Sequence, residues 1–264
     1  MLNRAQEGCA LPIETNSSIN SIHRLLLMVT VCLVVTSCAS RKKIQESLTI
    51  SPQSIRYLYD SEPLNCNRDK VIYLELNDSI PFNNVTPLNK DGGGALPLLV
   101  VNVFWENYEV LMGQDMIYPS YHQFFSESIV AESKRTGCFT LKEGKLDNNG
   151  FILKLSIDKC QTKGRLTSTF GIIALSGPSS TTYSFKPVNT ELIVNVKLFQ
   201  NNLVIFNKKY VLNHHQPFLS IRHKRTYANN HLELEHNMVE SLSFATKKII
   251  EDMIEDINNV MSSD

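Results

Sequence analysis

The pattern that most restricts the fold of this chain lies near its C-terminal end. Over residues 237–261, apolar side chains recur at spacings of three and four, the period of an amphipathic helix. The members of this stripe are Met238, Leu242, Ala245, Ile249, Met253, Ile257 and Val260. A helix with a continuous apolar stripe has to pack against another element. The rest of the chain must therefore supply an apolar surface, and a β-sheet is the expected partner.

Several segments have the β-branched and alternating pattern of strands. They cover residues 70–78, 98–105, 138–142, 151–160, 166–175, 191–199 and 203–212, and residues 200–202 predict a three-residue hairpin loop between the last two. Residues 79–97 are rich in Pro, Asn and Gly, which favours a loop. The sequence therefore predicts a sheet whose later strands are antiparallel.

A second helix is predicted over residues 120–136, where Tyr121, Phe125 and Ile129 recur every four residues. Gly137 follows at the position of a C-terminal cap. The order of elements predicts an α+β fold, a mainly antiparallel sheet with one face covered by two helices. We expect residues 70–264 to form a single domain.

Composition excludes two classes of protein. The 264 residues include 26 Lys+Arg and 26 Asp+Glu, so the formal charge is zero, whereas nucleic-acid-binding proteins normally carry a basic surplus. With 42% hydrophobic and 20% charged residues, the chain is also unlike a disordered acidic protein. We expect a globular protein with no nucleic-acid partner.

Residues 25–35 are apolar and uncharged, which matches the core of a secretion signal and is too short to span a bilayer. The run ends in Val35-Thr36-Ser37-Cys38, which resembles the lipobox of bacterial lipoproteins. The resemblance implies that Cys38 is lipidated and that cleavage precedes it. Residues 1–37 would then be a signal peptide and 38–69 a tether. The alternative is a buried core segment that ends in cysteine.

The leader departs from an ordinary signal peptide, since Arg4 and Arg24 are its only basic residues before the apolar run. Either translation starts after Met1 or the leader is unusual. Ala39 after the lipidated position implies, by resemblance, transfer to the outer membrane, and the basic residues 41–43 favour its periplasmic side.

The layout of the remaining chain is similar to that of small periplasmic lipoproteins of envelope assembly and transport. Residues 125–139 (FSESIVAESKRTGCF), residues 201–211 (NNLVIFNKKYV) and the terminal helix carry the similarity. Families with this pattern include auxiliary lipoproteins of ABC-type transporters and the domain that precedes the propeller in the Tol system protein. The lipid anchor, this layout and the absence of common catalytic motifs favour a non-catalytic protein that binds partners of an envelope transport or assembly complex.

Three cysteines remain after Cys38. If residues 138–160 form a hairpin that turns at Asn148-Asn149-Gly150, Cys138 and Cys160 become direct cross-strand neighbours within range of a disulfide. The alternative is two buried free thiols. This hypothesis leaves Cys66 without a role.

Motifs of common enzymes and metal sites are missing from the sequence, and we predict no cofactor and no metal site. His122, Asp115 and Ser126 are the groups that an envelope hydrolase could use, although no spacing relates them. His214, His215, His223, His231 and His236 crowd the connection before the last helix without a ligand spacing typical of zinc.

The same connection contains a basic cluster, Arg222, Lys224 and Arg225, that could contact anionic lipid. A solvated surface loop is the alternative reading. Partner binding in the cell envelope is the favoured function. An envelope hydrolase, or a carrier with an apolar cavity between sheet and helix, remains the alternative.

Overall fold

The structure is a computed structural model that describes residues 44–46, 48–49, 52–60, 62–77, 79–97, 101–144, 150–173, 177–178, 182–216 and 227–262. The chain divides into two compact units, residues 1–44 and 45–264, and the fold below is that of the second. Its elements are β1 (Gln53–Ser54), β2 (Val71–Leu76), β3 (Leu88–Pro97), β4 (Val101–Leu111), the short 3₁₀ helix η1 (Gln114–Met116), β5 (Ile117–Tyr118), α2 (Tyr121–Thr136), β6 (Thr140–Glu143), β7 (Phe151–Ile173), β8 (Gly177–Pro178), β9 (Thr182–Gln200), β10 (Leu203–Gln216) and α3 (Tyr227–Ser262).

Within the described residues, eight strands form one sheet, which contains the path β10-β9-β7-β2-β6. The long strand β7 joins its two parts: the first residues of β7 pair in parallel with β2, and the last pair antiparallel with β4. Strand β3 extends the sheet beyond β4, and β9 pairs antiparallel along most of β7. The fold is thus mixed α and β with a largely antiparallel sheet, and β2 supplies the parallel pairs with β6 and β7.

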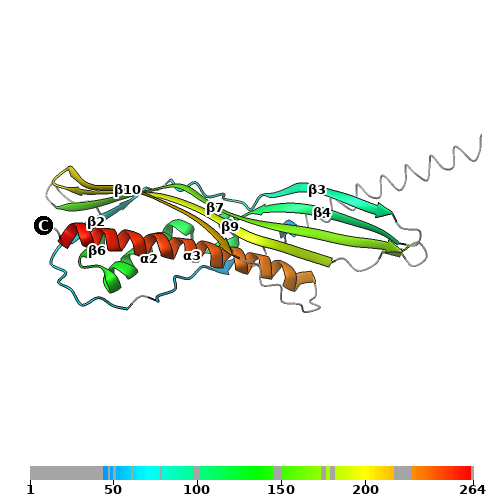
Figure 1. Cartoon of the computed structure of the whole chain (residues 1–264), viewed down its shortest axis with the longest axis horizontal. Coiled ribbons are helices and arrows are strands. Elements are labelled where there is room, and N and C mark those ends of the chain that lie inside the picture. Colours follow the sequence, from blue (N-terminus) through cyan, green and yellow to red (C-terminus); the bar gives the residue numbers. More distant parts are fainter. Residues whose placement is uncertain are drawn as a thin grey trace, which may run out of the picture. The chain divides into compact units, whose positions relative to one another are not determined.

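Helix α3 lies along the sheet, where it contacts β7, β9 and β10 (Figure 1). Most of the predicted stripe is buried: Met238, Leu242, Ala245, Ile249, Met253 and Ile257 are at most 2% exposed. Alternate residues of β9 meet them, since Leu192, Val194, Val196 and Leu198 are fully buried. The helix begins at Tyr227, earlier than the predicted 237. Helix α2 contacts α3 and β6, so α3 makes the main helical contact with the sheet.

Hydroxyl groups form part of this otherwise apolar interface. Thr190 shares hydrogen bonds with Thr162 on β7, at 3.0 Å, and with Ser241 on α3, at 2.8 Å. The hydroxyls of Tyr121 on α2 and Thr246 on α3 are 2.9 Å apart. Buried polar groups need such partners, and these bonds fix how α2 and α3 sit on the sheet.

Helix α2 has the predicted limits. The Ser120 hydroxyl accepts a hydrogen bond from the Gln123 amide at 3.3 Å, as an N-terminal cap does. Gly137 ends the helix with a φ of −81°, so its role is not to adopt a left-handed conformation. A Cβ at Gly137 would lie 2.5 Å from the carbonyl oxygen of Ser133. Glycine is needed there because the chain passes close to the last turn.

Two strand predictions are wrong. The predicted loop 79–97 contains β3, which pairs antiparallel with β4. One of its glycines is required by this pairing: Gly94 packs under the indole of Trp105 on β4, where a Cβ would lie 2.3 Å from the ring. The predicted strands 151–160 and 166–175 are one strand, β7, up to Ile173, and its pairing with β9 continues across the intervening residues through two bulges. Residues 174 and 175 lie outside the described part. The predicted strand 98–105 corresponds to β4 from Val101, and residues 98–100 lie outside the described part.

The hairpin between β9 and β10 turns at Asn201 and Asn202, with φ values of 49° and 67°. Both residues are in the left-handed region, where Asn is well tolerated, so the predicted three-residue loop is a two-residue turn.

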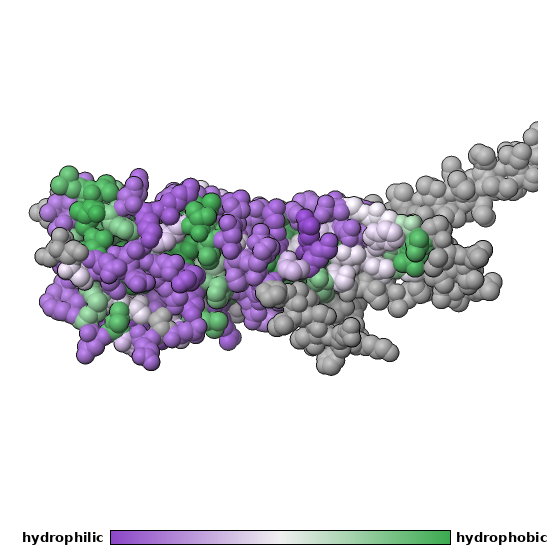
Figure 2. Space-filling model, viewed as in Figure 1, coloured by the Kyte–Doolittle hydropathy of each residue, from purple (hydrophilic) through white to green (hydrophobic). Residues whose placement is uncertain are grey.

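Hydrophobic side chains gather at the end of the sheet that carries this turn, where Leu203 is 72% exposed and Val204 is 52% exposed (Figure 2).

The predicted tether over 38–69 is wrong for its later part. Strand β1 pairs in parallel with β5, Ile55 is only 3% exposed, and Cys66 forms a disulfide with Cys138. Residues 52–69 therefore belong to the folded unit, because apolar contacts and a covalent link hold them on α2 and α3. The described helices include none that is long and apolar enough to cross a membrane.

Candidate binding groove

A groove with a volume of about 410 Å³ lies over one side of α3, between the segment that contains β1 and the end of β10. Its lining residues come from three separate parts of the chain: Gln53, Ser54, Arg56 and Leu58 from the first segment, His214 and Gln216 from β10, and His236, Val239, Glu240, Ser243 and Phe244 from α3. The groove thus exists only when all three parts are folded together.

The apolar part of the groove is exposed to an unusual degree. Phe244 is 47% exposed and Leu58 is 59% exposed, whereas Val239, which also lines the groove, is buried. The imidazole of His214 lies against the Phe244 ring, with 4.4 Å between the ring centroids. Partial burial, together with the neighbouring His215, lowers the pKa of His214. The ring is therefore neutral at pH 7 and adds to the apolar surface.

Polar groups surround this apolar surface on one side. The Gln216 amide donates to a Glu240 carboxylate oxygen at 3.2 Å, and Nε2 of His236 lies 3.0 Å from the other oxygen. His236 and Glu240 are both more than half exposed. The rim can therefore donate and accept hydrogen bonds around an apolar centre, the usual layout of a protein-binding surface.

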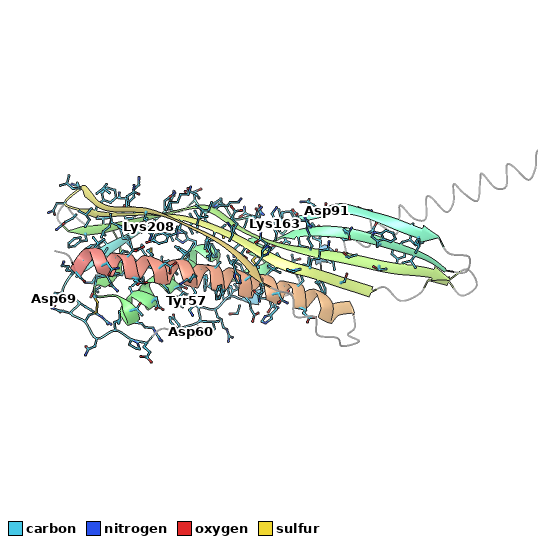
Figure 3. All side chains as sticks on the ribbon, in the orientation of Figure 1. Tyr57, Asp60, Asp69, Asp91, Lys163 and Lys208 are labelled. Atoms are coloured by element: carbon cyan, nitrogen blue, oxygen red, sulfur yellow. A yellow bond between two sulfur atoms is a disulfide. The ribbon has the colours of Figure 1, made fainter. Side chains whose placement is uncertain are left out.

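The wall formed by residues 53–58 is held in place by backbone contacts. The Ile55 amide donates to the Tyr118 carbonyl at 3.0 Å, and the Ser243 hydroxyl of α3 donates to the Arg56 carbonyl. Beyond the groove, Asp60 forms an ion pair with Lys247 of α3, and Figure 3 shows Tyr57 and Asp60 on the segment that runs beside the helices. Residues 53–58 are therefore held against β5 and α3 by these contacts.

A buried carboxyl group lies beside this groove. Glu235 on α3 is fully buried, and this burial raises its pKa to about 8. The charge of Asp115 acts in the same direction, whereas contact with Gln53 acts against it. Glu235 is thus mainly protonated at pH 7 in the folded protein and ionised in the unfolded chain, whose reference pKa is 4.5.

This difference predicts that the free energy of unfolding falls as pH rises from about 4.5 to 8, because only the folded state holds the proton in that interval. Above about pH 8 both states are ionised and this contribution stays constant. We expect Glu235→Gln to become more stable relative to wild type by about 1 kcal/mol or more between pH 5 and pH 8.5 in urea unfolding. The exposed Glu255→Gln is the control. Parallel pH dependence of wild type and Glu235→Gln would contradict the assignment.

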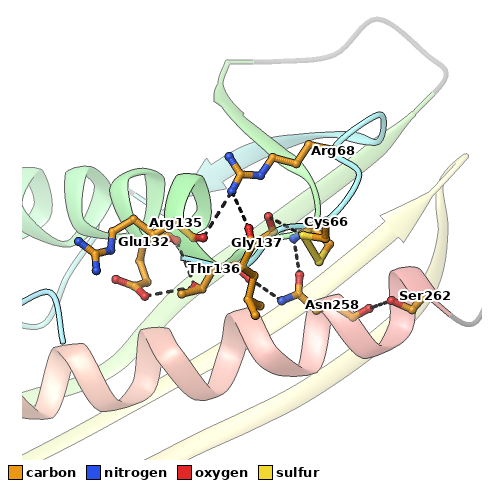
Figure 4. The surroundings of a disulfide bond; sticks show 10 residues. Cys66, Arg68, Glu132, Arg135, Thr136, Gly137, Asn258 and Ser262 are labelled. Atoms are coloured by element: carbon orange, nitrogen blue, oxygen red, sulfur yellow. Dashed lines mark hydrogen bonds between the residues drawn. A yellow bond between two sulfur atoms is a disulfide. The ribbon is translucent and has the colours of Figure 1, made fainter. Parts of the chain in front are cut away.

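The disulfide lies where three segments meet (Figure 4). Cys66 and Cys138 have Cα atoms 5.4 Å apart and are separated by 72 residues. Asn258 of α3 accepts from the Cys138 amide at 2.7 Å and donates to the Thr136 carbonyl at 2.8 Å, while the Leu64 amide donates to the Arg135 carbonyl at 2.9 Å. The last carbonyls of α2 are thereby satisfied by α3 and by the segment before β2.

The predicted Cys138–Cys160 pair is wrong. Strand β2 lies between β6 and β7 and pairs in parallel with both, so residues 138–160 do not form a hairpin. Cys160 is a free, buried thiol whose pKa is raised by burial, while the hydroxyl of Tyr121 acts in the opposite direction. The disulfide partner of Cys138 is Cys66 and not Cys160.

The other predicted site residues are scattered or lie outside the described residues. Four of them lie outside the described residues: Cys38, Arg222, Lys224 and Arg225. Among the candidate hydrolase groups, Asp115 accepts hydrogen bonds from the amide and hydroxyl of Thr86, and Ser126 donates to Glu143. Each of these two groups has a structural partner. In the described part of the chain, no group of three or more His, Cys, Asp or Glu could hold a metal ion.

Sequence reasoning missed the groove, although two signals for it exist. Phe244 lies between stripe members Leu242 and Ala245 but off the stripe, so its large side chain points away from the core. Leu58 stands between Tyr57 and Tyr59 in the supposed tether. Exposed apolar side chains indicate a contact surface when they gather in one patch, as Phe244 and Leu58 do in the folded chain.

Comparisons with known proteins establish no specific function. No family model and no curated protein matches the sequence. Among solved structures, the chain is similar to protein XCC0632 from Xanthomonas campestris, of family DUF330, with 9% identity, coverage of 80% of this chain and 96% of that chain, and a TM-score of 0.37. This similarity is weak.

Proposed function

We propose that this chain is a lipid-anchored protein of the bacterial cell envelope, on the periplasmic side of the outer membrane, that binds a partner protein without catalysis. The observation that carries the binding role is the groove between β10, α3 and residues 53–58. It combines an exposed apolar centre, Phe244 and Leu58, with a hydrogen-bonding rim.

The disulfide supports a location outside the cytoplasm. Disulfides persist in oxidising compartments and are rare where thiols are kept reduced. The pairing of Cys66 with Cys138 thus agrees with the secretion signal and the lipobox-like sequence that ends in Cys38. These are independent features, since one depends on the fold and the other on the leader.

The groove also lies close to the proposed anchor along the chain. Gln53, the first lining residue, lies only 15 positions after Cys38. Fully extended, that length reaches at most about 50 Å. A partner held in the groove would therefore sit near the membrane surface, which fits a protein of a membrane-associated envelope complex.

A ligand carrier fits the described residues less well. That hypothesis places an apolar cavity between the sheet and the terminal helix. Buried side chains of α3 and β9 fill this interface, with Leu242, Ile249, Val194 and Val196 all at most 2% exposed. Partner binding at the outer groove requires no such cavity.

Site-specific crosslinking in intact cells tests the binding role. A photoreactive amino acid replaces Leu58 in the groove or, as the control, Val211, which is 56% exposed on β10. We expect a discrete protein adduct from position 58, at least tenfold weaker when Phe244→Ala is added. Because Phe244 is half exposed, this substitution should cost about 1 kcal/mol of stability or less. Equal adducts from both positions, or none from position 58, would overturn the proposal.

A further inference from the structure

The sheet face opposite α3 is covered with charged side chains. Four lysines there have carboxylate partners on other strands of the sheet: the distances are 2.9 Å for Lys154–Glu75, 2.6 Å for Lys159–Glu191, 3.6 Å for Lys163–Glu109 and 3.6 Å for Lys209–Asp158. Lys197 on β9 is an exception, because no carboxylate of the described residues lies within 4.0 Å of its ammonium group.

Lys197 also stands next to a like charge. It is the direct cross-strand neighbour of Lys154 on β7. Like charges directly opposite each other in a sheet are destabilising. Glu75 balances Lys154 alone, so the pair retains one uncompensated positive charge on adjacent strands.

A cavity of about 590 Å³ lies over this lysine pair, at the end of β2. This volume is within the range of small-molecule sites. Its lining residues are Leu74, Glu75, Leu76, Asn77, Gly144, Lys154, Leu155, Ser156, Asn195 and Lys197. Asn77 accepts a hydrogen bond from the Ser79 amide through Oδ1 at 3.2 Å, which leaves its NH₂ group as the donor.

We propose that this cavity binds a phosphate group of a small molecule or of a lipid headgroup. The ammonium group of Lys197 supplies the net charge, since Glu75, which also lines the cavity, balances that of Lys154. The Lys154 ammonium group, the Ser156 hydroxyl and the amide groups of Asn77 and Asn195 supply further donors. A phosphate bound between the two lysines would attract both ammonium groups and so offset the repulsion between them. The site is separate from the groove on α3 and does not depend on the proposed partner.

The test uses the full chain purified in detergent and two probes. Inorganic pyrophosphate is titrated by calorimetry, and vesicles that contain phosphatidic acid are used in cosedimentation. We expect Lys197→Gln to weaken binding of the preferred probe at least tenfold and Lys197→Arg less than threefold. Lys163→Gln, which removes the same charge from the same face farther along β7 (Figure 3), should change it less than twofold.

The outcomes are distinguishable. Binding of pyrophosphate identifies a soluble phosphate ligand, and binding of the vesicles alone identifies a headgroup; either supports the site if it depends on Lys197. Without probe, Lys197→Gln should melt at the same temperature as wild type or higher, because a like-charge contact is lost. Equal weakening by Lys163→Gln and Lys197→Gln, or no binding of either probe at millimolar concentration, would overturn the proposal.

Discussion

Replacement of both Cys66 and Cys138 by Ser is expected to lower the free energy of unfolding by about 4 kcal/mol. The disulfide links residues 72 positions apart, and in the chain-entropy account a closed loop of that length restricts the unfolded chain by this amount. Urea unfolding measures the loss directly. A reductant should destabilise the wild type by a similar amount and leave the double variant unchanged.

Cys160→Ala is the matched control. It removes a buried thiol without touching the disulfide, so its unfolding should remain sensitive to reductant. Peptide mapping without reduction should recover Cys66 and Cys138 in one linked peptide. Recovery of Cys138 linked to Cys160, or a double variant as stable as the wild type, would contradict the structure.

The parts of the fold that sequence predicted well are those governed by local periodicity. Helix α2 begins and ends where its apolar repeat, Ser120 and Gly137 indicate. The stripe on α3 and the hairpin of β9 and β10 are also confirmed. In each case, neighbouring residues in the sequence determine both the conformation and the buried face.

The errors arise from contacts between distant segments. The hairpin assumed for residues 138–160 fails because β2 enters between β6 and β7, an insertion that no spacing in that segment reveals. The composition of residues 52–69 is that of a linker, yet Ile55 and Cys66 hold this segment on the folded unit. The groove was missed for the same reason, since residues 53–58 form it together with β10 and α3, which lie more than 150 residues later in the chain.

The proposed membrane location of the groove depends on lipidation of Cys38. Bacterial cells that express the chain are labelled with radioactive palmitate, and the purified protein is examined for label. The wild type should carry label, Cys38→Ala should carry none, and Cys32→Ala, within the apolar run, should carry as much as the wild type. Label that persists on Cys38→Ala, or its absence from the wild type, would contradict the account.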